Sequence, residues 1–276
     1  MKSALPMKSN LRHLSVSTLI LVTQAILAVS AAAGGSEASK SGSEKYGEAP
    51  IRSFSQRIND RLDQEKVNVA IIARAGRSRA ELPNGIRYTH VALTVFEPVE
   101  TPDGTVAYTY TVYNLFQGDE GWNDRSYLAQ DFTYDFAAGI VESDVAICVP
   151  TDDLQKRLLA VIRSPVYQKM HNPDYNVLTN PWVDRYDNCV THTVKLCFAA
   201  IYQTDDRARI YENMRAYFQP APIRLGLFKS IGSGFVTGIS QQDRDPSGLQ
   251  TASYGSLKSF LESNGLVKNS FTVSVN

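Results

Sequence analysis

The sequence predicts an α+β protein in which an antiparallel sheet packs against helices. Two β-branched and aromatic runs, at 87–98 and 105–117, flank an Asp-Gly dipeptide, which is a strong signal for a β-hairpin. Apolar residues recur at helical spacing over 51–65 and predict an amphipathic helix before the hairpin. No internal repeat and no second linker is visible after residue 48, so we expect a single α+β domain over 49–276.

The first 33 residues have the pattern of a secretory signal peptide. Three cations precede an apolar run from Leu14 to Val29, and small residues that suit cleavage follow it. A membrane anchor is the alternative, but the run is short for a span and is interrupted by Ser, Thr and Gln. Residues 34–48 are rich in Gly, Ser, Glu and Lys and predict a flexible tether. We therefore expect a periplasmic or secreted protein with no stable membrane span after cleavage.

The charge balance argues against nucleic acid as a partner. The whole chain has 28 Lys and Arg against 28 Asp and Glu. Removing residues 1–33 takes away three cations and no acids, which leaves 25 cations against 28 acids. A mildly acidic protein lacks the positive surface that nucleic acid or an anionic membrane would need.

The remaining elements follow from local patterns. Residues 67–75 predict a strand, and 81–86 contain Pro and Asn-Gly turn chemistry. Residues 118–143 look like an aromatic-rich loop, and 171–188 are rich in Asn and Pro and should be irregular. Thr151 should cap a helix. The other expected elements are strands at 144–150 and 271–275 and helices at 151–165, 189–202, 205–217 and 254–264.

The chain has three cysteines, and an odd number in an exported protein leaves at least one thiol unpaired. Cys189 and Cys197 are eight residues apart on one predicted helix, roughly 12 Å along its axis, which exceeds disulfide reach. Cys197 lies in the apolar stripe of that helix, and Cys148 lies in the middle of a strand. Both should be small buried hydrophobic residues.

Cys189 differs because it lies at the first turn of its helix, about 120° from the centre of the apolar stripe. Asn188 is a suitable N-cap. The helix dipole and the free backbone N–H groups should lower the thiol pKa, and they offer an oxyanion hole for acyl transfer. A nucleophilic Cys189, with Asn188 at the oxyanion site, is the functional interpretation. An ordinary first-turn cysteine is the structural one.

A thiol nucleophile needs a base, and the chain has four histidines. His13 belongs to the signal peptide, and His192 should face solvent, almost opposite the apolar stripe. His171 lies in the irregular stretch and has no partner pattern. His90 is preferred because a strand would hold it rigidly, on a face whose small neighbour Ala92 leaves room for a helix terminus or a substrate.

An orienting group for His90 should come from the neighbouring strand of the hairpin. Asn114 can lie roughly opposite His90, and Tyr110 and Gln117 are alternatives, since alternation does not determine the register. Other site types have weaker support. No second Cys/His pair has zinc spacing, and the glycines of 232–238 lack a strand–turn–helix context, so we expect no metal and no cofactor.

Two motifs resemble circularly permuted papain-like proteins, a superfamily that includes NlpC-like amidases and peptidases and lecithin–retinol-acyltransferase-like enzymes. YTHVALTV is similar to their SHVGI-type histidine strand, and YNVLTNPWVDRYDNCVTHTV is similar to their NC-E-H-F-type cysteine helix. The resemblance implies a permuted papain-like fold, with Cys189 as nucleophile and His90 as general acid/base. It also implies that the histidine just after the cysteine is not catalytic. The third position has Asn114 as its polar candidate, rather than His or Glu.

Over about residues 50–265 the chain also resembles an uncharacterised family of exported bacterial proteins, a domain of unknown function. LPNGIRYTHVAL, VYNLFQGDE, RSYLAQDF and NCVTHTV resemble that family's blocks. The expected function is a cysteine-dependent hydrolase or acyltransferase acting on a peptide or amide, with bacterial cell-wall peptides as the natural substrate class. A non-catalytic periplasmic binding or scaffold protein is the alternative. A lipid acyltransferase would need an apolar groove.

Overall fold

The computed structural model describes residues 41–118, 122–223 and 249–276. Six strands form one sheet in the order β4-β3-β2-β1-β5-β8, and the pairs β1–β2, β1–β5, β3–β4 and β5–β8 are antiparallel. This architecture confirms the predicted α+β class with an antiparallel sheet. The strands are β1 (Val69–Arg74), β2 (His90–Glu100), β3 (Val106–Gln117), β4 (Ser126–Phe132), β5 (Asp144–Pro150) and β8 (Val267–Ser274).

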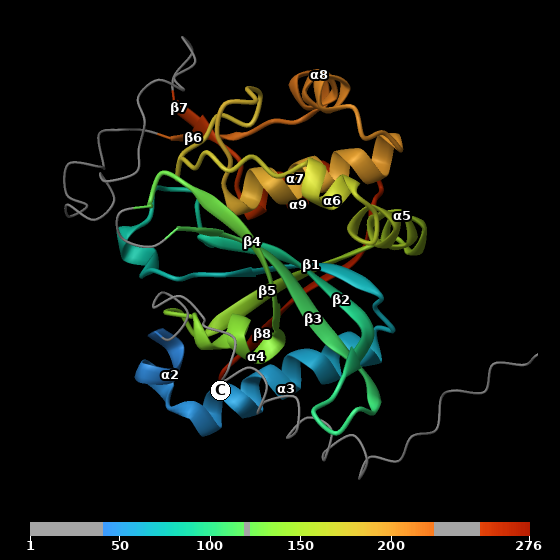
Figure 1. The fold of residues 1–276 in the computed structure, drawn as a ribbon. Coiled ribbons are helices and arrows are strands. Elements are labelled where there is room, and N and C mark those ends of the chain that lie inside the picture. The colour runs from blue at the N-terminus through green and yellow to red at the C-terminus, as the bar shows by residue number, and fades with distance from the viewer. Residues whose placement is uncertain (1–40, 119–121, 224–248) are drawn as a thin grey trace, which may run out of the picture. The chain divides into compact units, whose positions relative to one another are not determined.

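Helices cover both faces of this sheet, as Figure 1 shows. On one face lie α2 (Ser41–Tyr46), α3 (Glu48–Gln64) and α4 (Thr133–Ala138), and on the other lie α5 (Asp152–Ile162), α7 (Cys189–Tyr202) and α9 (Tyr254–Ser263). Strand β1 is buried on both sides, which explains its uninterrupted apolar run. Its Ala70 and Ile72 pack toward α3, while Val69, Ile71 and Ala73 pack toward α7.

Helix α3 confirms the amphipathic pattern, because all four apolar residues of the predicted stripe are buried against the sheet. Residues Pro98–Tyr108 form the tip of the β2–β3 hairpin and belong to a different compact unit from the other described residues. Within this tip, Gly104 has a φ of 78°, a conformation that glycine adopts without strain. The predicted Asp-Gly turn is therefore confirmed.

Helix α7 differs from its prediction as an amphipathic helix. Twelve of its residues, Cys189 through Ala200, are buried. Because α5 and α8 (Arg207–Tyr217) pack on it and the sheet lies beneath, no face of this part is left for solvent. The expectation that His192 faces solvent is wrong, since His192 is only 3 % exposed.

Three short elements lie where the sequence predicted a tether or a loop. Residues 41–46, within the expected tether, form α2, whose Gly42 is buried; a Cβ there would lie 2.8 Å from the carbonyl oxygen of Ala138. Residues 126–138, within the expected loop, form β4 and α4. Strand β4 is at the sheet edge and half-exposed, and α4 has only six residues, so neither carries a strong periodic signal.

The predicted caps are confirmed elsewhere. The Thr151 hydroxyl accepts from the Leu154 N–H at the start of α5, as predicted. Ser253 caps α9, a cap that was not predicted from the sequence. The 3-10 helix η2 (Arg79–Glu81), short α6 (Val166–Lys169) and the pair β6 (Ala221–Ile223) and β7 (Leu249–Thr251) complete the described fold, and none of these four was predicted. Residues 1–33 and the glycines of 232–238 lie outside the described residues. None of the helices in the described ranges is long and apolar enough to cross a membrane.

Candidate functional site

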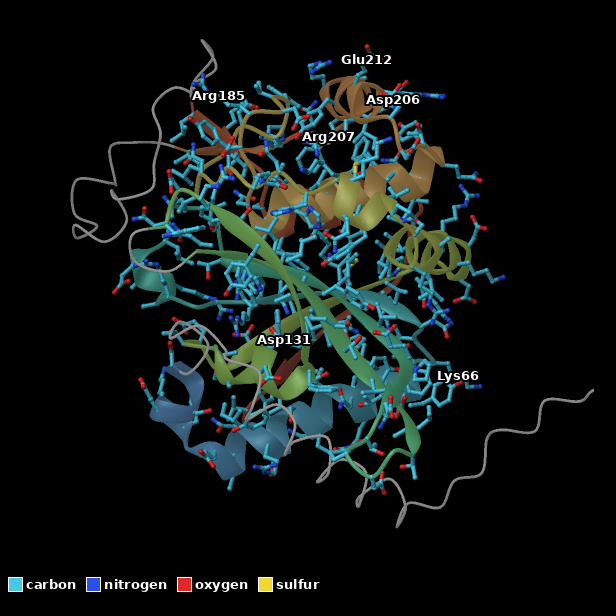
Figure 2. All side chains as sticks on the ribbon, viewed as in Figure 1. Lys66, Asp131, Arg185, Asp206, Arg207 and Glu212 are labelled. Carbon is cyan, nitrogen blue, oxygen red and sulfur yellow. The ribbon has the colours of Figure 1, made fainter. Side chains whose placement is uncertain are left out.

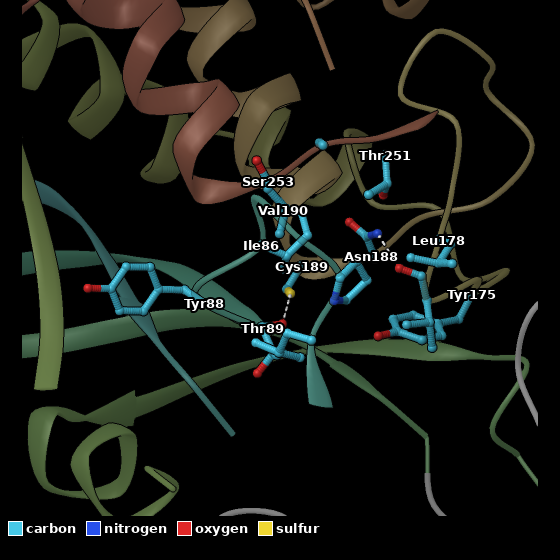
Figure 3. A pocket seen from close by; sticks show the side chains of 14 residues that line it. Ile86, Tyr88, Thr89, Tyr175, Leu178, Asn188, Cys189, Val190, Thr251 and Ser253 are labelled. Carbon is cyan, nitrogen blue, oxygen red and sulfur yellow. Dashed lines mark hydrogen bonds between the residues drawn. The ribbon is translucent and has the colours of Figure 1, made fainter. Parts of the chain in front are cut away.

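Cys189 lies at the N-terminus of α7, with its sulfur against strand β2 (Figure 3). The thiol donates to the carbonyl oxygen of Thr89 at 3.6 Å. The backbone N–H groups of Val91 and Val190 hydrogen-bond to the sulfur and favour a thiolate. Thr89 and Val91 flank His90, so the sulfur lies beside the backbone of the segment that carries the predicted base.

Asn188 is the N-cap of α7, as predicted. Its side-chain oxygen accepts from the Thr191 N–H at 2.8 Å, and its amide nitrogen donates to the Val177 carbonyl oxygen at 3.0 Å. Both polar atoms of the side chain are therefore engaged. Asn188 therefore positions the start of the helix.

His90 and Asn114 are brought together as predicted. His90 Nε2 and Asn114 Oδ1 are 2.9 Å apart. The two alternatives for the orienting group are engaged elsewhere, since Tyr110 donates to the Val67 carbonyl oxygen and Gln117 donates to the Asn123 carbonyl oxygen.

The position of Asn114 determines the proton on His90. Asn114 Nδ2 lies between two acceptors, the Val112 carbonyl oxygen and Asp131 Oδ2, each at 3.1 Å. The amide oxygen must therefore face the histidine, and Nε2 must carry the hydrogen. His90 Nδ1 then keeps a free lone pair and can accept a proton. Figure 2 marks Asp131 on the side of the sheet that carries α4.

His90 is held neutral. Burial, and after it the nearby Arg74 guanidinium, lower its pKa to about 3, and the hydrogen bond to Asn114 opposes the shift. Arg74 is itself buried and donates to the Phe136 carbonyl oxygen at 2.7 Å. The His90 ring stacks on Phe116 with a centroid separation of 5.0 Å. The His90 imidazole can therefore accept a proton during a reaction, but it carries no positive charge at neutral pH.

We expect His90 to stay an Nε2–H tautomer between pH 5 and pH 8. Because its folded pKa lies well below the ordinary value of about 6.5, protons bind the unfolded chain first, and stability falls as pH drops below about 6.5. Nitrogen-15 spectra of the histidine side chains, assigned with His90→Gln, measure the tautomer and the pKa of His90. An Nδ1–H signal, or titration of His90 near pH 6.5, would contradict this description.

Cys189 and His90 approach β2 from opposite faces of the sheet. Val91 and Leu93 pack with α7 and Cys189, while Ala92 packs with α3 and Phe136, which also contacts the His90 ring. Of the two uses expected for the space beside His90 and Ala92, a helix terminus or a substrate, the α7 terminus does not take it, because α7 packs on the opposite face. The structure shows the His90–Asn114 hydrogen bond and the Cys189–Thr89 hydrogen bond, but no hydrogen bond joins His90 to Cys189.

The environment of Cys189 stabilises the neutral thiol. Burial raises its pKa to about 11, and this effect exceeds the opposing contributions of the two N–H groups and Arg74. The expectation that the helix terminus lowers the pKa below the ordinary value is therefore wrong. The N–H groups act in the predicted direction, but the side chain is only 5 % exposed, and loss of hydration dominates.

A buried ion pair joins α7 to the segment that precedes it. Lys195 Nζ is 2.7 Å from Asp187 Oδ2 and also donates to the Met170 carbonyl oxygen. Neither side chain of the pair is exposed, and His192 Nδ1 lies 3.6 Å from the same carboxylate oxygen. Asp187 immediately precedes Asn188, so the pair ties the irregular segment to the helix at the point where Cys189 is presented.

A small cavity of about 70 Å³ adjoins Cys189 (Figure 3). Tyr175 lies at its wall, where burial raises the pKa of its hydroxyl, and the negative charge of a Cys189 thiolate would add to this shift. Asp131, Tyr175, Asp187 and Lys195 were not identified from the sequence. Of these four residues, only Asp131 could have been found from the sequence. Had β4 been predicted, Asp131 would have shared a strand face with Asn114. In the described part of the chain, no group of three or more His, Cys, Asp or Glu could hold a metal ion.

Comparison with known proteins identifies the family. Residues 61–261 match the model of a family described as uncharacterized protein conserved in bacteria (DUF2145). The chain belongs to this family. The match includes the histidine strand, the cysteine helix and the ion pair, so the whole candidate site lies inside the DUF2145 region. No curated protein and no solved structure matches the chain.

Proposed function

We propose that this DUF2145 protein is an exported thiol hydrolase that forms a thioester on Cys189, with His90 as general acid/base. The observation that carries the proposal is the position of the Cys189 sulfur at the start of α7, against the backbone that flanks His90. Asn114 orients His90 so that Nδ1 can accept a proton. The resemblance to permuted papain-like proteins supports the same assignment of roles.

The proposed reaction begins when the sulfur attacks the carbonyl carbon of an amide or ester. The S–C bond forms as the thiol proton passes to His90 Nδ1 by way of one water at the start of β2, because the two side chains lie on opposite faces of the sheet. The carbonyl oxygen takes a negative charge that backbone N–H groups near the helix start would stabilise. The tetrahedral intermediate then expels the amine or alcohol, which takes the bonding electron pair and the proton from His90. Water attacks the thioester with His90 as base, which releases the carboxylic acid and restores the thiol.

In this mechanism His90 acts as a neutral base on a neutral thiol. A pre-formed thiolate–imidazolium pair is disfavoured, because burial raises the pKa of Cys189 and lowers the pKa of His90. The thiol must first leave the Thr89 carbonyl oxygen, so we propose that substrate binding breaks this hydrogen bond. The substrate is an amide or ester of a carboxylic acid, and cell-wall peptides are a class of amide that the periplasm would supply.

The test is acylation by p-nitrophenyl acetate. We expect nitrophenolate release together with a 42 Da gain that peptide mapping places on Cys189, since an acetyl group replaces one hydrogen. Cys189→Ala should abolish the adduct at this position, and His90→Ala should slow acylation about 100-fold, a common magnitude for the loss of a general base. Cys148 and Cys197 act as internal controls because both are buried and free.

His171→Ala is the matched control for His90→Ala, since His171 is a partly buried histidine whose ring hydrogen-bonds Ser126 instead. It should acylate at the wild-type rate. Equal acylation rates for the wild type and a folded His90→Ala variant would contradict the role of His90 as general base. An adduct on every cysteine but Cys189 would contradict the proposal as a whole.

Non-catalytic ligand binding is the second candidate. It is favoured by the absence of a hydrogen bond between Cys189 and His90, and by the thiol's donation to a backbone carbonyl. A binding protein would give no nitrophenolate above the spontaneous rate, and Cys189→Ser would keep the affinity for its ligand. A thiol hydrolase would lose turnover in the same variant.

A further inference from the structure

The cavity beside Cys189 has an uncharged wall. Among the residues that the structure describes, fourteen line it, and none has a charged side chain. Most of the wall is apolar, with Ile86, Val177, Leu178, Val190 and Ala252 among its residues. The amide oxygen of Asn188 caps α7, and the hydroxyl of Ser253 caps α9. A ligand in this cavity would therefore meet mainly hydrocarbon.

Thr251 brings a buried hydroxyl into this wall. It is 4 % exposed, and its hydroxyl oxygen has no hydrogen-bond partner among the described residues. A buried hydroxyl without a partner costs free energy, so most such groups in proteins are hydrogen-bonded. Thr251 lines the cavity together with Cys189, and Figure 3 shows both side chains around it. Its hydroxyl can therefore serve a bound molecule.

We infer that this cavity binds the acyl part of the substrate, and that it selects a short, uncharged acyl group with one hydrogen-bonding atom for Thr251. The inference rests on the proposed function for its chemistry, because an acyl group transferred to Cys189 must lie next to the sulfur. It goes further by assigning the substrate class, which the catalytic groups alone do not determine.

Size and charge both support this assignment. A volume of about 70 Å³ corresponds to roughly five water-sized positions, at about 10–15 Å³ each, which suits a chain of a few carbons. A carboxylate on the acyl group would lose its hydration without gaining a cation, because no Lys or Arg lies in the described wall. An acidic acyl group should therefore be rejected.

The experiment uses thioesters of N-acetylcysteamine with four acyl groups: acetyl, butyryl, 3-hydroxybutyryl and succinyl. In each reaction the Cys189 sulfur forms a bond to the acyl carbon and the thioester C–S bond breaks. The thiol proton passes through His90 to the leaving thiolate, so no oxidant or reductant is needed. We expect butyryl and 3-hydroxybutyryl to acylate Cys189 about 100-fold faster than succinyl, as measured by intact-protein mass.

Thr251→Val tests the hydroxyl with a side chain of similar shape. We expect 3-hydroxybutyryl transfer to fall about tenfold while butyryl transfer is unchanged, and the melting temperature to stay the same or rise, because an unpartnered buried hydroxyl is removed. Thr272→Val is the matched control, since Thr272 is exposed on β8. It should change neither rate.

A parallel binding measurement separates this inference from the proposed function. Butyramide, 3-hydroxybutyramide and succinamate are added to the Cys189→Ala variant, which has no thiol to acylate, and the methyl resonances of Val177, Leu178 and Val190 report whether they enter the cavity. Acylation that ignores acyl charge and Thr251 would overturn the inference and leave the thiol hydrolase intact. Selective binding of the uncharged amides without any acylation would support the cavity assignment and overturn the hydrolase. Failure of both measurements would overturn both.

Discussion

Replacing Lys195 with methionine should lower the free energy of unfolding by about 3–5 kcal/mol, the range found when one partner of a buried ion pair is removed. The substitution keeps most of the side-chain volume but leaves the carboxylate of Asp187 buried without its cation. His192 is close to the same oxygen, but its own burial lowers its pKa and opposes protonation. Urea unfolding of the purified protein measures the change.

The matched control is Lys169→Met. Lys169 forms an ion pair with Asp205 at the same 2.7 Å, but both side chains are about half exposed. Exposed pairs contribute about 0–1 kcal/mol, so this variant should unfold close to the wild type. Removing both buried charges in Lys195→Met/Asp187→Leu should restore part of the loss. Equal stabilities for Lys195→Met and Lys169→Met would show that the buried pair does not hold the segment before Cys189.

Cys189 should react slowly with a small alkylating reagent at neutral pH. With a pKa of about 11, its thiolate fraction at pH 7 is about 300-fold smaller than that of an ordinary thiol of pKa about 8.5. The rate with iodoacetamide should rise about tenfold per pH unit from pH 7 to pH 10, because only the thiolate reacts. Mass spectrometry of the Cys189 peptide over a pH series measures this profile.

Ser274→Cys provides an ordinary thiol in the same protein, since Ser274 is exposed at the end of β8. Its alkylation should level off near pH 9, while that of Cys189 continues to rise. A plateau for Cys189 below pH 8 would indicate a stabilised thiolate and would contradict the neutral-thiol mechanism. Slow alkylation is compatible with acyl transfer, because a bound ester meets the thiol and its base together.

Local patterns predicted the fold where the pattern was long. The spacing of Ile51, Phe54, Ile58 and Leu62 was enough for α3, because each of these residues lies on one helix face. The Asp-Gly turn determined the β2–β3 hairpin in the same way. Strand β4 and helix α4 were missed because a half-exposed edge strand and a six-residue helix leave little periodicity.

The candidate site was predicted in its parts but not in its arrangement. The link between His90 and Asn114 followed from neighbouring strands of one hairpin, and the Asn188 cap followed from its position before an apolar run. The ion pair of Asp187 and Lys195 was not predicted, because a helical wheel treats a lysine as solvated. Only packing on every side of α7 makes that lysine buried.

The sequence by itself determined the α+β class, the helix start at Cys189, the strand at His90 and the membership of the DUF2145 family. These features depend on residue types at short spacing, which local geometry constrains. The tertiary structure alone decided that α7 covers the Val91 face of β2, that Cys189 is a neutral thiol and that Thr251 adjoins it. Alternation distinguishes the two faces of a strand, but it does not say which face a helix 99 residues later will cover. That choice depends on packing free energy summed over the whole core.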